Sequence, residues 1–304
     1  MPWRGKVDRA RSILINAREH ARRTPWPEES QGSPARVAIL TVNHNTAELI
    51  AQLLYSVFRV LDAGAVTRVV VVDNKSQDRS REVLSVLAEQ GLIDLVINER
   101  LPYHGPGLNR GMNLLVRAQR AGDRPVRWVW VLDSDTVVLR PDALHASLHM
   151  LERCGGVLAG QFQYILPGFE QTGYAALASL LLDPSRTWHG LIPPFQEHGA
   201  PGAAMQRGLR RHKADVVNFP FFDDEYLIHL GQGTLRGIAE RGDTSNPYYE
   251  WATSHVRYHY HGNPRGEELH RRYLERFVAD VPRLDGELLA GALRSSEQVR
   301  VSLA

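Results

Sequence analysis

Apolar and amphipathic segments alternate along the first half of the chain. Four short apolar segments fit buried strands, namely residues 36–43, 66–74, 93–99 and 126–135. Three stretches between them have the apolar spacing of a helix and end at a glycine, namely residues 46–64, 78–91 and 109–122. Strands this apolar, separated by amphipathic helices, predict an α/β fold with a mostly parallel sheet covered on both faces.

The second half of the chain is less regular. We expect a helix over Ala203–Arg211, a strand entered at Val216–Pro220 and a further strand that contains His229. Two helices follow at residues 266–280 and 285–296, and they either pack over the sheet or form a dimer contact.

An arginine-rich amphipathic helix is predicted near the start of the chain, over residues 5–23. Its apolar face carries Val7, Ala10, Leu14, Ala17 and Ala21. We expect this helix to pack on the domain, and contact with an anionic membrane surface is the alternative. Prolines and small residues at 24–34 indicate a linker.

Composition excludes several classes of protein. The 304 residues fit one large domain or two intimate ones, and the net charge of +2 gives no field that favours nucleic acid. Cys154 is the only cysteine, so an internal disulfide is impossible and a reducing, cytoplasmic setting is expected. No apolar run approaches the ~20 residues of a membrane span, and the first residues do not resemble a secretory signal.

Polar residues gather where the predicted strands end, which is where ligands bind in such sheets. Asn43 follows the first strand, Asp73 and Asn74 the second, and Asp133 and Asp135 the fourth. The third strand is followed by GPGLNRG, whose spacing G-x-G-x-x-x-G differs from the dinucleotide fingerprint. A tight turn at the start of a helix explains this stretch better than the dinucleotide-binding site of an oxidoreductase does.

Two ionised aspartates directly after a buried strand are costly unless they are paired, solvated or bound to a cation. If the chain turns between Asp133 and Asp135, both carboxylates can serve one ligand. Mg²⁺ and Mn²⁺ take oxygen ligands from carboxylates and phosphates. The alternatives are that Asp135 caps the following helix or that both residues lie in a solvated turn.

Four segments in this order resemble the GT-A-fold glycosyltransferases of family 2. They are VAILTVNHNTAEL, VVVVDNKSQDRS, GPGLNRGMN and VLDSD, all within residues 36–140. The resemblance implies a nucleotide-sugar donor with Mn²⁺ or Mg²⁺. By this resemblance Asp73 reads the base, and Asp133 and Asp135 serve the ribose and the metal. A carboxylate at Asp73 can accept the N3–H of uracil or thymine, which cytosine lacks, so we expect a UDP or dTDP donor.

The residues expected on the donor side are Thr41, Asn43, Asp73, Asn74, Asn109, Gly111, Asp133 and Ser134. The resemblance makes His229 a third metal ligand beside Asp133 and Asp135, with His255, His259 or His261 as replacements. It implies four regions, namely an extension and linker at 1–34, a nucleotide-sugar-binding half at 35–150, an acceptor half at 151–262 and a helical tail at 263–304.

The general base is the open question. When the second half of the chain is aligned with the family so that Pro220 and His229 match its pattern, the base is expected near Ala200, where no acid occurs. The nearest upstream acid is Glu197. The rival is Asp224 in FFDDEYL, which resembles the family's aromatic-E-D segment. An inverting transferase needs one such carboxylate within reach of the acceptor hydroxyl. Glu197 is favoured slightly.

The expected function is metal-dependent transfer of a hexose to a hydroxyl acceptor on a glycan, a lipid-linked molecule or a natural product, with inversion as the default. A sugar nucleotidyltransferase shares the sheet, but its first strand should be followed by a glycine-rich basic loop, which TVNHNTAEL lacks. A non-catalytic nucleotide-sugar-binding protein stays open because no acid stands near Ala200.

Overall fold

The computed structural model describes residues 2–27, 36–61, 64–99, 103–123, 125–164, 166–196, 200–231, 242, 260 and 263–301. Side chains are described from residue 11 to residue 295 within these ranges.

The first four strands form the parallel half of the sheet, as predicted. They are β1 (Val37–Asn43), β2 (Val66–Asp73), β3 (Asp94–Ile97) and β4 (Trp128–Leu132). β1 pairs in parallel with β2 and β4, and β2 pairs in parallel with β3. Parallel pairing brings Asn43 opposite Asp73, so the polar ends of these strands meet at one edge of the sheet.

Three later strands extend the sheet beyond β4, and the antiparallel pairing among them was not predicted. They are β6 (Leu158–Gln163), β7 (Tyr174–Leu182) and β8 (Val216–Asn218). In the described chain the seven strands lie in the order β3-β2-β1-β4-β7-β6-β8, and β7 runs antiparallel to both of its neighbours. β7 is buried along its whole length.

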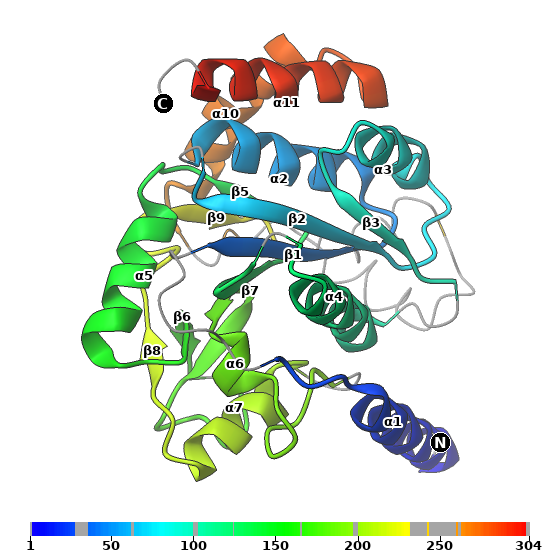
Figure 1. Ribbon diagram of the computed structural model, residues 1–304, viewed down its shortest axis with the longest axis vertical. Helices are drawn as coiled ribbons and strands as arrows, with labels where there is room; N and C mark the ends of the chain where they lie inside the picture. The colour runs from blue at the N-terminus through cyan, green and yellow to red at the C-terminus, as the bar shows by residue number, and fades with distance from the viewer. Residues whose placement is uncertain are drawn as a thin grey trace.

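Helices cover both faces of this sheet (Figure 1). One face carries α2 (Ala47–Val60), α3 (Ser80–Glu89), α5 (Ala143–Cys154), α10 (Gly266–Asp280) and α11 (Gly286–Val301). The other face carries α4 (His104–Arg120), the short α6 (Pro184–Thr187) and α7 (Ala203–Arg211). The tail helix α11 packs on α2 and α3. It therefore covers the core on this face of the sheet, and packing over the sheet was one of the two arrangements predicted for the tail helices. No helix of the described chain has both the length and the apolar character that a membrane span requires.

A short two-stranded ribbon lies beside the main sheet. It pairs β5 (Thr136–Val138) with β9 (Leu227–His229) in antiparallel register, so that Thr136 faces His229. The strand predicted over residues 126–135 ends at Leu132, and the chain turns at Asp133–Asp135 before β5 begins, which is the turn that a ligand shared by both aspartates requires. This turn makes β5 a separate element and brings His229 to the end of β4.

The helix α4 begins at His104, five residues before the predicted start at Asn109. The stretch GPG belongs to its first turn, where a proline is tolerated because the backbone N–H would have no helical partner. A side chain at Gly105 would collide with the carbonyl of Gln196, and one at Gly111 with Leu40. The glycines therefore let α4 approach its neighbours closely.

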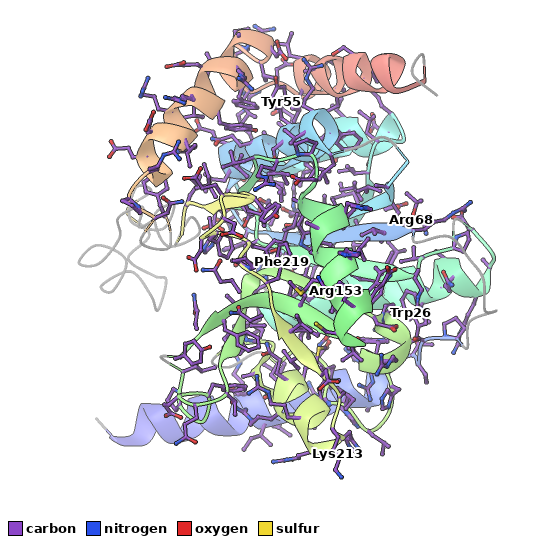
Figure 2. All side chains as sticks on the ribbon, turned by 90° about the vertical axis from the view of Figure 1, so that its left-hand side faces the viewer. Trp26, Tyr55, Arg68, Arg153, Lys213 and Phe219 are labelled. Carbon is purple, nitrogen blue, oxygen red and sulfur yellow. The ribbon has the colours of Figure 1, made fainter. Side chains whose placement is uncertain are left out.

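The first helix, α1 (Pro2–Arg22), packs on the domain through a different face from the one predicted. Ser12, Ile15 and Glu19 are buried, whereas Leu14 is 60% exposed. The following segment is not a free linker at its start, because Trp26 is buried and its backbone N–H donates to the Trp188 carbonyl (Figure 2).

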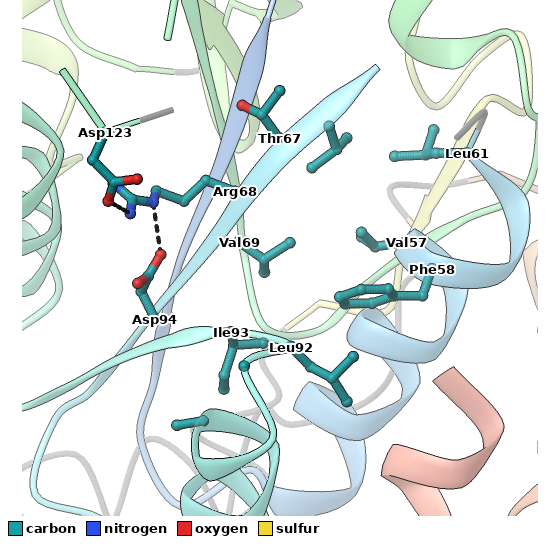
Figure 3. A pocket seen from close by; sticks show the side chains of 13 residues that line it. Val57, Phe58, Leu61, Thr67, Arg68, Val69, Leu92, Ile93, Asp94 and Asp123 are labelled. Carbon is teal, nitrogen blue, oxygen red and sulfur yellow. Dashed lines mark hydrogen bonds and ion pairs between the residues drawn. The ribbon is translucent and has the colours of Figure 1, made fainter. Parts of the chain in front are cut away.

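A pocket of about 370 Å³ lies at the amino end of β2 (Figure 3). Arg68 is 8% exposed there, and its guanidinium contacts Asp94 at 2.8 Å and Asp123 at 2.6 Å. Leu92 and Phe58 form the apolar side of the pocket. Because Asp73 ends β2 at its other end, this pocket lies at the opposite edge of the sheet from the polar strand ends.

Candidate functional site

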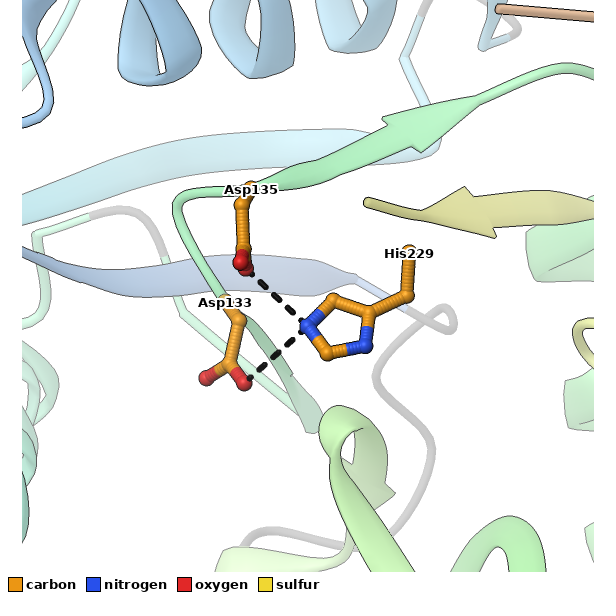
Figure 4. Close-up of side chains that lie close together, drawn as sticks. All are labelled: Asp133, Asp135 and His229. Atoms are coloured by element: carbon orange, nitrogen blue, oxygen red, sulfur yellow. Dashed lines mark hydrogen bonds and ion pairs between the residues drawn. The ribbon is translucent and has the colours of Figure 1, made fainter. Parts of the chain in front are cut away.

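Asp133, Asp135 and His229 form one cluster (Figure 4). His229 Nε2 lies 3.0 Å from Asp135 Oδ1 and 3.8 Å from Asp133 Oδ2. One potential ligand atom from each residue lies within 4.8 Å of the others. Two carboxylates and an imidazole at such spacing offer the donor types that Mn²⁺ accepts.

Backbone hydrogen bonds hold the cluster in place. The Asp133 N–H donates to the Ala178 carbonyl of β7, and the Thr136 N–H donates back to the Asp133 carbonyl at 3.0 Å. The Leu230 N–H donates to the Asp135 carbonyl at 2.9 Å. Since three strands fix the turn, the two carboxylates face one point although an unbroken strand would direct them to opposite faces.

The electrostatics of the cluster favour a cation. Burial raises the pKa of Asp133, the charges of His104 and His229 oppose this, and Asp135 adds to it. Burial alone would lower the pKa of His229, but the charge and hydrogen bond of Asp135 and the charge of Asp133 outweigh it, so the pKa of His229 is raised. The pKa of Asp133 is therefore raised mainly because the carboxyl group is buried, whereas the pKa of His229 is raised because two carboxylates face it.

His104 lies beside Asp133, and the charge of Asp133 acts on Tyr174; the sequence pattern singled out neither residue. His104 Nε2 lies 3.4 Å from Asp133 Oδ1. Burial raises the pKa of the Tyr174 hydroxyl, and the charge of Asp133 raises it further. His104 stands at the end of the third strand's loop, a position that marks candidates in such folds, whereas Tyr174 had no signal because β7 was not predicted.

The ends of β1, β2 and β4 are joined by a buried polar network. Asn43 Nδ2 donates to Asp73 Oδ1 at 3.0 Å and to Ser76 Oγ at 3.1 Å. Thr46 Oγ1 lies 2.7 Å from Asn43 Oδ1 and 3.2 Å from Ser134 Oγ. The residues expected on the donor side at three separate strand ends therefore share one network.

Asp73 is fully buried and accepts from three donors. Besides Asn43, the Ser76 N–H donates to it at 3.1 Å and Arg81 Nε donates at 3.1 Å. These contacts order the turn after β2. Contact with a nucleotide base stays a prediction, and the carboxylate, which can accept about four hydrogen bonds, has capacity for one more donor.

Other residues expected on the donor side are occupied by contacts within the fold. Asn74 Nδ2 donates to the Tyr103 carbonyl at 2.9 Å. Asn109 Nδ2 donates to the Phe195 carbonyl at 2.9 Å and to Glu19 at 3.2 Å. Gly111 packs on β1, and the Thr41 hydroxyl is buried without a hydrogen-bond partner among the described residues.

Among the described residues, no contact joins Asp224 to the cluster. Asp224 is exposed in the turn before β9, and its carbonyl accepts from Arg140, which follows β5. The turn itself comes close to the cluster, because the ring centroid of Phe222 lies 6.0 Å from that of His229. Asp224 therefore stays the rival candidate for the base.

Glu197 lies outside the described residues, as do His255, His259 and His261. The described residues on both sides of Glu197 lie near the cluster. Gln196 packs against Gly105, next to His104, and its backbone N–H donates to the Pro201 carbonyl at 2.9 Å. Gly202 lies beside the Tyr174 hydroxyl. Helix α7, β8 and β9 then follow in the order that the alignment through His229 requires.

A family model described as glycosyl transferase family 2 matches residues 38–215, which is more than half of the chain. That segment contains β1 to β4 and both aspartates of the cluster. No curated protein matches the chain by sequence.

Solved structures share the fold. A mannosyltransferase (PcManGT) from Pyrobaculum calidifontis, in complex with GDP-Man and Mn²⁺, is 14% identical with a TM-score of 0.52, and the match covers 96% of this chain and 83% of that one. A glucosyl-3-phosphoglycerate synthase from Mycobacterium tuberculosis, in complex with Mg²⁺ and UDP, is 13% identical with a TM-score of 0.46, covering 64% and 75%. TarS from S. aureus, in complex with UDP-GlcNAc, is 14% identical with a TM-score of 0.43, covering 57% and 53%.

Proposed function

The chain belongs to glycosyl transferase family 2, and from this membership we propose that it transfers a hexose from a UDP- or dTDP-sugar to a hydroxyl acceptor with inversion. The observation that carries the proposal is the cluster of Asp133, Asp135 and His229. It lies at the edge of the sheet where the carboxyl ends of β1, β2 and β4 meet, which is the ligand-binding edge of such folds.

The residues of the cluster fit a divalent cation. The buried carboxylate of Asp135 and the half-buried carboxylate of Asp133, 3.0 Å and 3.8 Å from one imidazole, are costly unless a positive charge is near. Asp135 and His229 would hold Mn²⁺ or Mg²⁺, with Asp133 beside them. When bound, the metal neutralises charge that develops on the diphosphate as the nucleotide leaves.

The network from Asp73 to Ser134 is proposed to position the nucleoside. It ties the turn after β2 to the cluster through Asn43 and Thr46. A network that is already ordered loses little conformational freedom when the donor binds. The diphosphate is thereby directed toward Asp135.

Glu197 is proposed as the base that accepts the proton of the acceptor hydroxyl. The support comes from its described neighbours, since Gln196 packs against Gly105 of α4 and Gly202 lies beside Tyr174. Gly105 adjoins His104, which lies 3.4 Å from Asp133. Asp224 is the alternative base.

The test is a thermal-shift screen of nucleotides and nucleotide-sugars, with and without Mn²⁺, followed by a transfer or hydrolysis assay on the best ligand. A ligand that binds only the folded state raises the unfolding midpoint by mass action. We expect UDP- or dTDP-sugars to give the largest shifts and to be turned over. Binding without any turnover would favour the non-catalytic alternative, and no shift with any nucleotide-sugar would contradict the proposal.

A further inference from the structure

An exposed apolar stripe runs along the outer side of α1. Ile13 is 61% exposed and Leu14 is 60% exposed. Ala17 and Ala21 are exposed as well, and at 100° per residue all four fall within one arc of about 100°. Two large apolar side chains rarely stay this exposed side by side unless something covers them.

Arginines border this stripe. Arg11, Arg18 and Arg22 are exposed on the helix, and at 100° per residue they lie next to Leu14 on the helix circumference. Glu19, the one acid among the described side chains of α1, is buried and bonded to Asn109. The outer face of α1 is therefore apolar and positive, without a described carboxylate to offset the charge.

A second basic feature lies at the end of α1. A pocket of about 330 Å³ is lined by Arg186, His189, His212 and Lys213, and no acid is among its lining residues in the described chain. Burial lowers the pKa of His189, and the nearby charge of Arg23 lowers it further. Arg186 and Lys213 therefore supply the fixed charge at neutral pH.

Arg23 links the end of α1 to this pocket. Arg23 directly follows α1, and its guanidinium donates to the carbonyl of Ile192, a residue that lines the pocket. Trp188 Nε1 donates to the Thr24 carbonyl at 3.0 Å. Figure 2 places Lys213 at the end of the molecule along which α1 runs. Two separate segments thus present positive charge at one end of the protein.

We propose that this end of the protein, formed by the outer face of α1 and the Arg186–Lys213 pocket, docks on an anionic phospholipid membrane. Ile13 and Leu14 enter the boundary between headgroups and acyl chains, as apolar faces of interfacial helices do. The arginines and Lys213 contact lipid phosphates. The positive charge of this face favours an anionic membrane over a second copy of the chain, because two copies that face each other would bring their arginines together.

The inference does not rest on the proposed transfer reaction. The docking face contains none of the residues assigned to the metal or the nucleoside, so membrane binding and nucleotide binding can fail separately. Docking would hold the start of α4 close to the bilayer, because Arg11 lies over the ring of Tyr103, the residue before His104, at 5.8 Å from its centroid.

Co-sedimentation of the full chain with vesicles tests the inference. One set of vesicles is phosphatidylcholine, and the other is phosphatidylcholine mixed with phosphatidylglycerol. We expect binding to the anionic set alone, weakening as salt is added. Arg18→Gln should weaken binding roughly fivefold, and Ile13→Asp with Leu14→Asp should abolish it. The matched controls are Arg153→Glu and Val278→Asp, which change an exposed arginine and a 53% exposed valine on other helices and should bind as wild type does.

Three results would overturn the inference. The first is equal binding to both vesicle sets, or binding to neither. The second is full binding by the Ile13→Asp, Leu14→Asp variant. The third is a dimer in light scattering that this variant abolishes, because a second copy would then cover the stripe. The unfolding midpoint of each variant is measured beside the binding. If the double variant unfolds early, Arg18→Gln still decides, because its side chain makes no packing contact that folding requires.

Discussion

His229 Nε2 lies 3.0 Å from Asp135 Oδ1, although 94 positions separate the two residues in the chain. The antiparallel pairing of β5 with β9 produces this contact, because Thr136 faces His229. The imidazole thereby completes a cluster that the two aspartates begin, and the proposed metal site is shared between the two halves of the chain.

Substitution of Asp135 or of His229 should make nucleotide binding independent of the divalent metal. Asp135→Asn and His229→Gln are each expected to weaken Mn²⁺ binding by at least roughly tenfold, since even substitutions beside a metal ligand commonly cost that much. Titration calorimetry of Mn²⁺ and of UDP, before and after EDTA, measures both effects.

His145→Gln is the matched control for this prediction, because His145 is exposed on α5 away from the cluster. Its Mn²⁺ affinity should equal that of wild type. Equal UDP affinity with and without metal in the wild-type protein would count against the site.

Nucleotide selectivity should depend on whether the base carries a hydrogen at N3. UDP and dTDP are expected to bind more tightly than CDP, by roughly ten- to hundredfold, because a hydrogen bond to a charged group contributes ~1.5–3 kcal/mol. Competition between the nucleotides on the wild-type protein measures this preference.

Asp73→Asn should reduce that selectivity and also lower stability, since the carboxylate orders the turn through Ser76 and Arg81. Urea unfolding of the variant separates the two effects. Tighter binding of CDP or ADP to the wild type would show that Asp73 does not read the base.

The general base should be identified by a fall in turnover without a fall in donor affinity. Glu197→Gln is expected to lower kcat by about 10²–10⁴-fold, because the base acts on the acceptor hydroxyl in the transition state. Single-turnover kinetics with a saturating donor measure the effect.

Asp224→Asn is the comparison, and it should remain within a few-fold of wild type because Asp224 is exposed and no described contact joins it to the cluster. A dead Asp224→Asn enzyme with an active Glu197→Gln enzyme would reverse the assignment.

Gly111→Ala should destabilise the fold by ~1–3 kcal/mol, the usual effect of an added carbon in a packed core. The new Cβ would collide with Leu40 of β1. Gly291→Ala on α11 is the matched control, since nothing lies within 4 Å of its Cβ position, and it should be neutral or stabilising by ~0.5–1 kcal/mol. Urea unfolding compares the two variants, and equal stability would contradict the packing role of Gly111.

The parallel half of the fold could be predicted because its strands are continuous apolar runs and its helices have a clear period. The antiparallel strand β7 was missed because YAALASLLL is rich in alanine and leucine, which favour helices, and has no β-branched residue. The strand β6 was missed because LAGQFQ is neither a continuous apolar run nor a strict alternation. β5 was missed because three residues are too few to show a period. The apolar residues of α1 were visible, but which face contacts the domain depends on partners distant in the chain, such as Asn109 for Glu19.

The candidate site could be predicted where the end of a strand fixes the residue. Asp133 and Asp135 follow β4, and His229 was expected from the resemblance to family 2. His104 and Tyr174 were missed because they belong to the start of α4 and to β7, neither of which the pattern located. Conversely, Asn109 and Gly111 lie where expected, but their contacts are with the protein itself.

The division of the cluster between β5 and β9 has a consequence for how fragments of this protein behave. The segment that matches the family ends at residue 215, before His229 is reached. A chain cut there would keep both aspartates and lose the imidazole together with the strand that pairs with β5. During synthesis the first four strands emerge well before β9, so the sheet can begin to form while the cluster is still incomplete. Acquisition of a divalent ion would then mark the stage at which residues near 229 have left the ribosome and joined the ribbon.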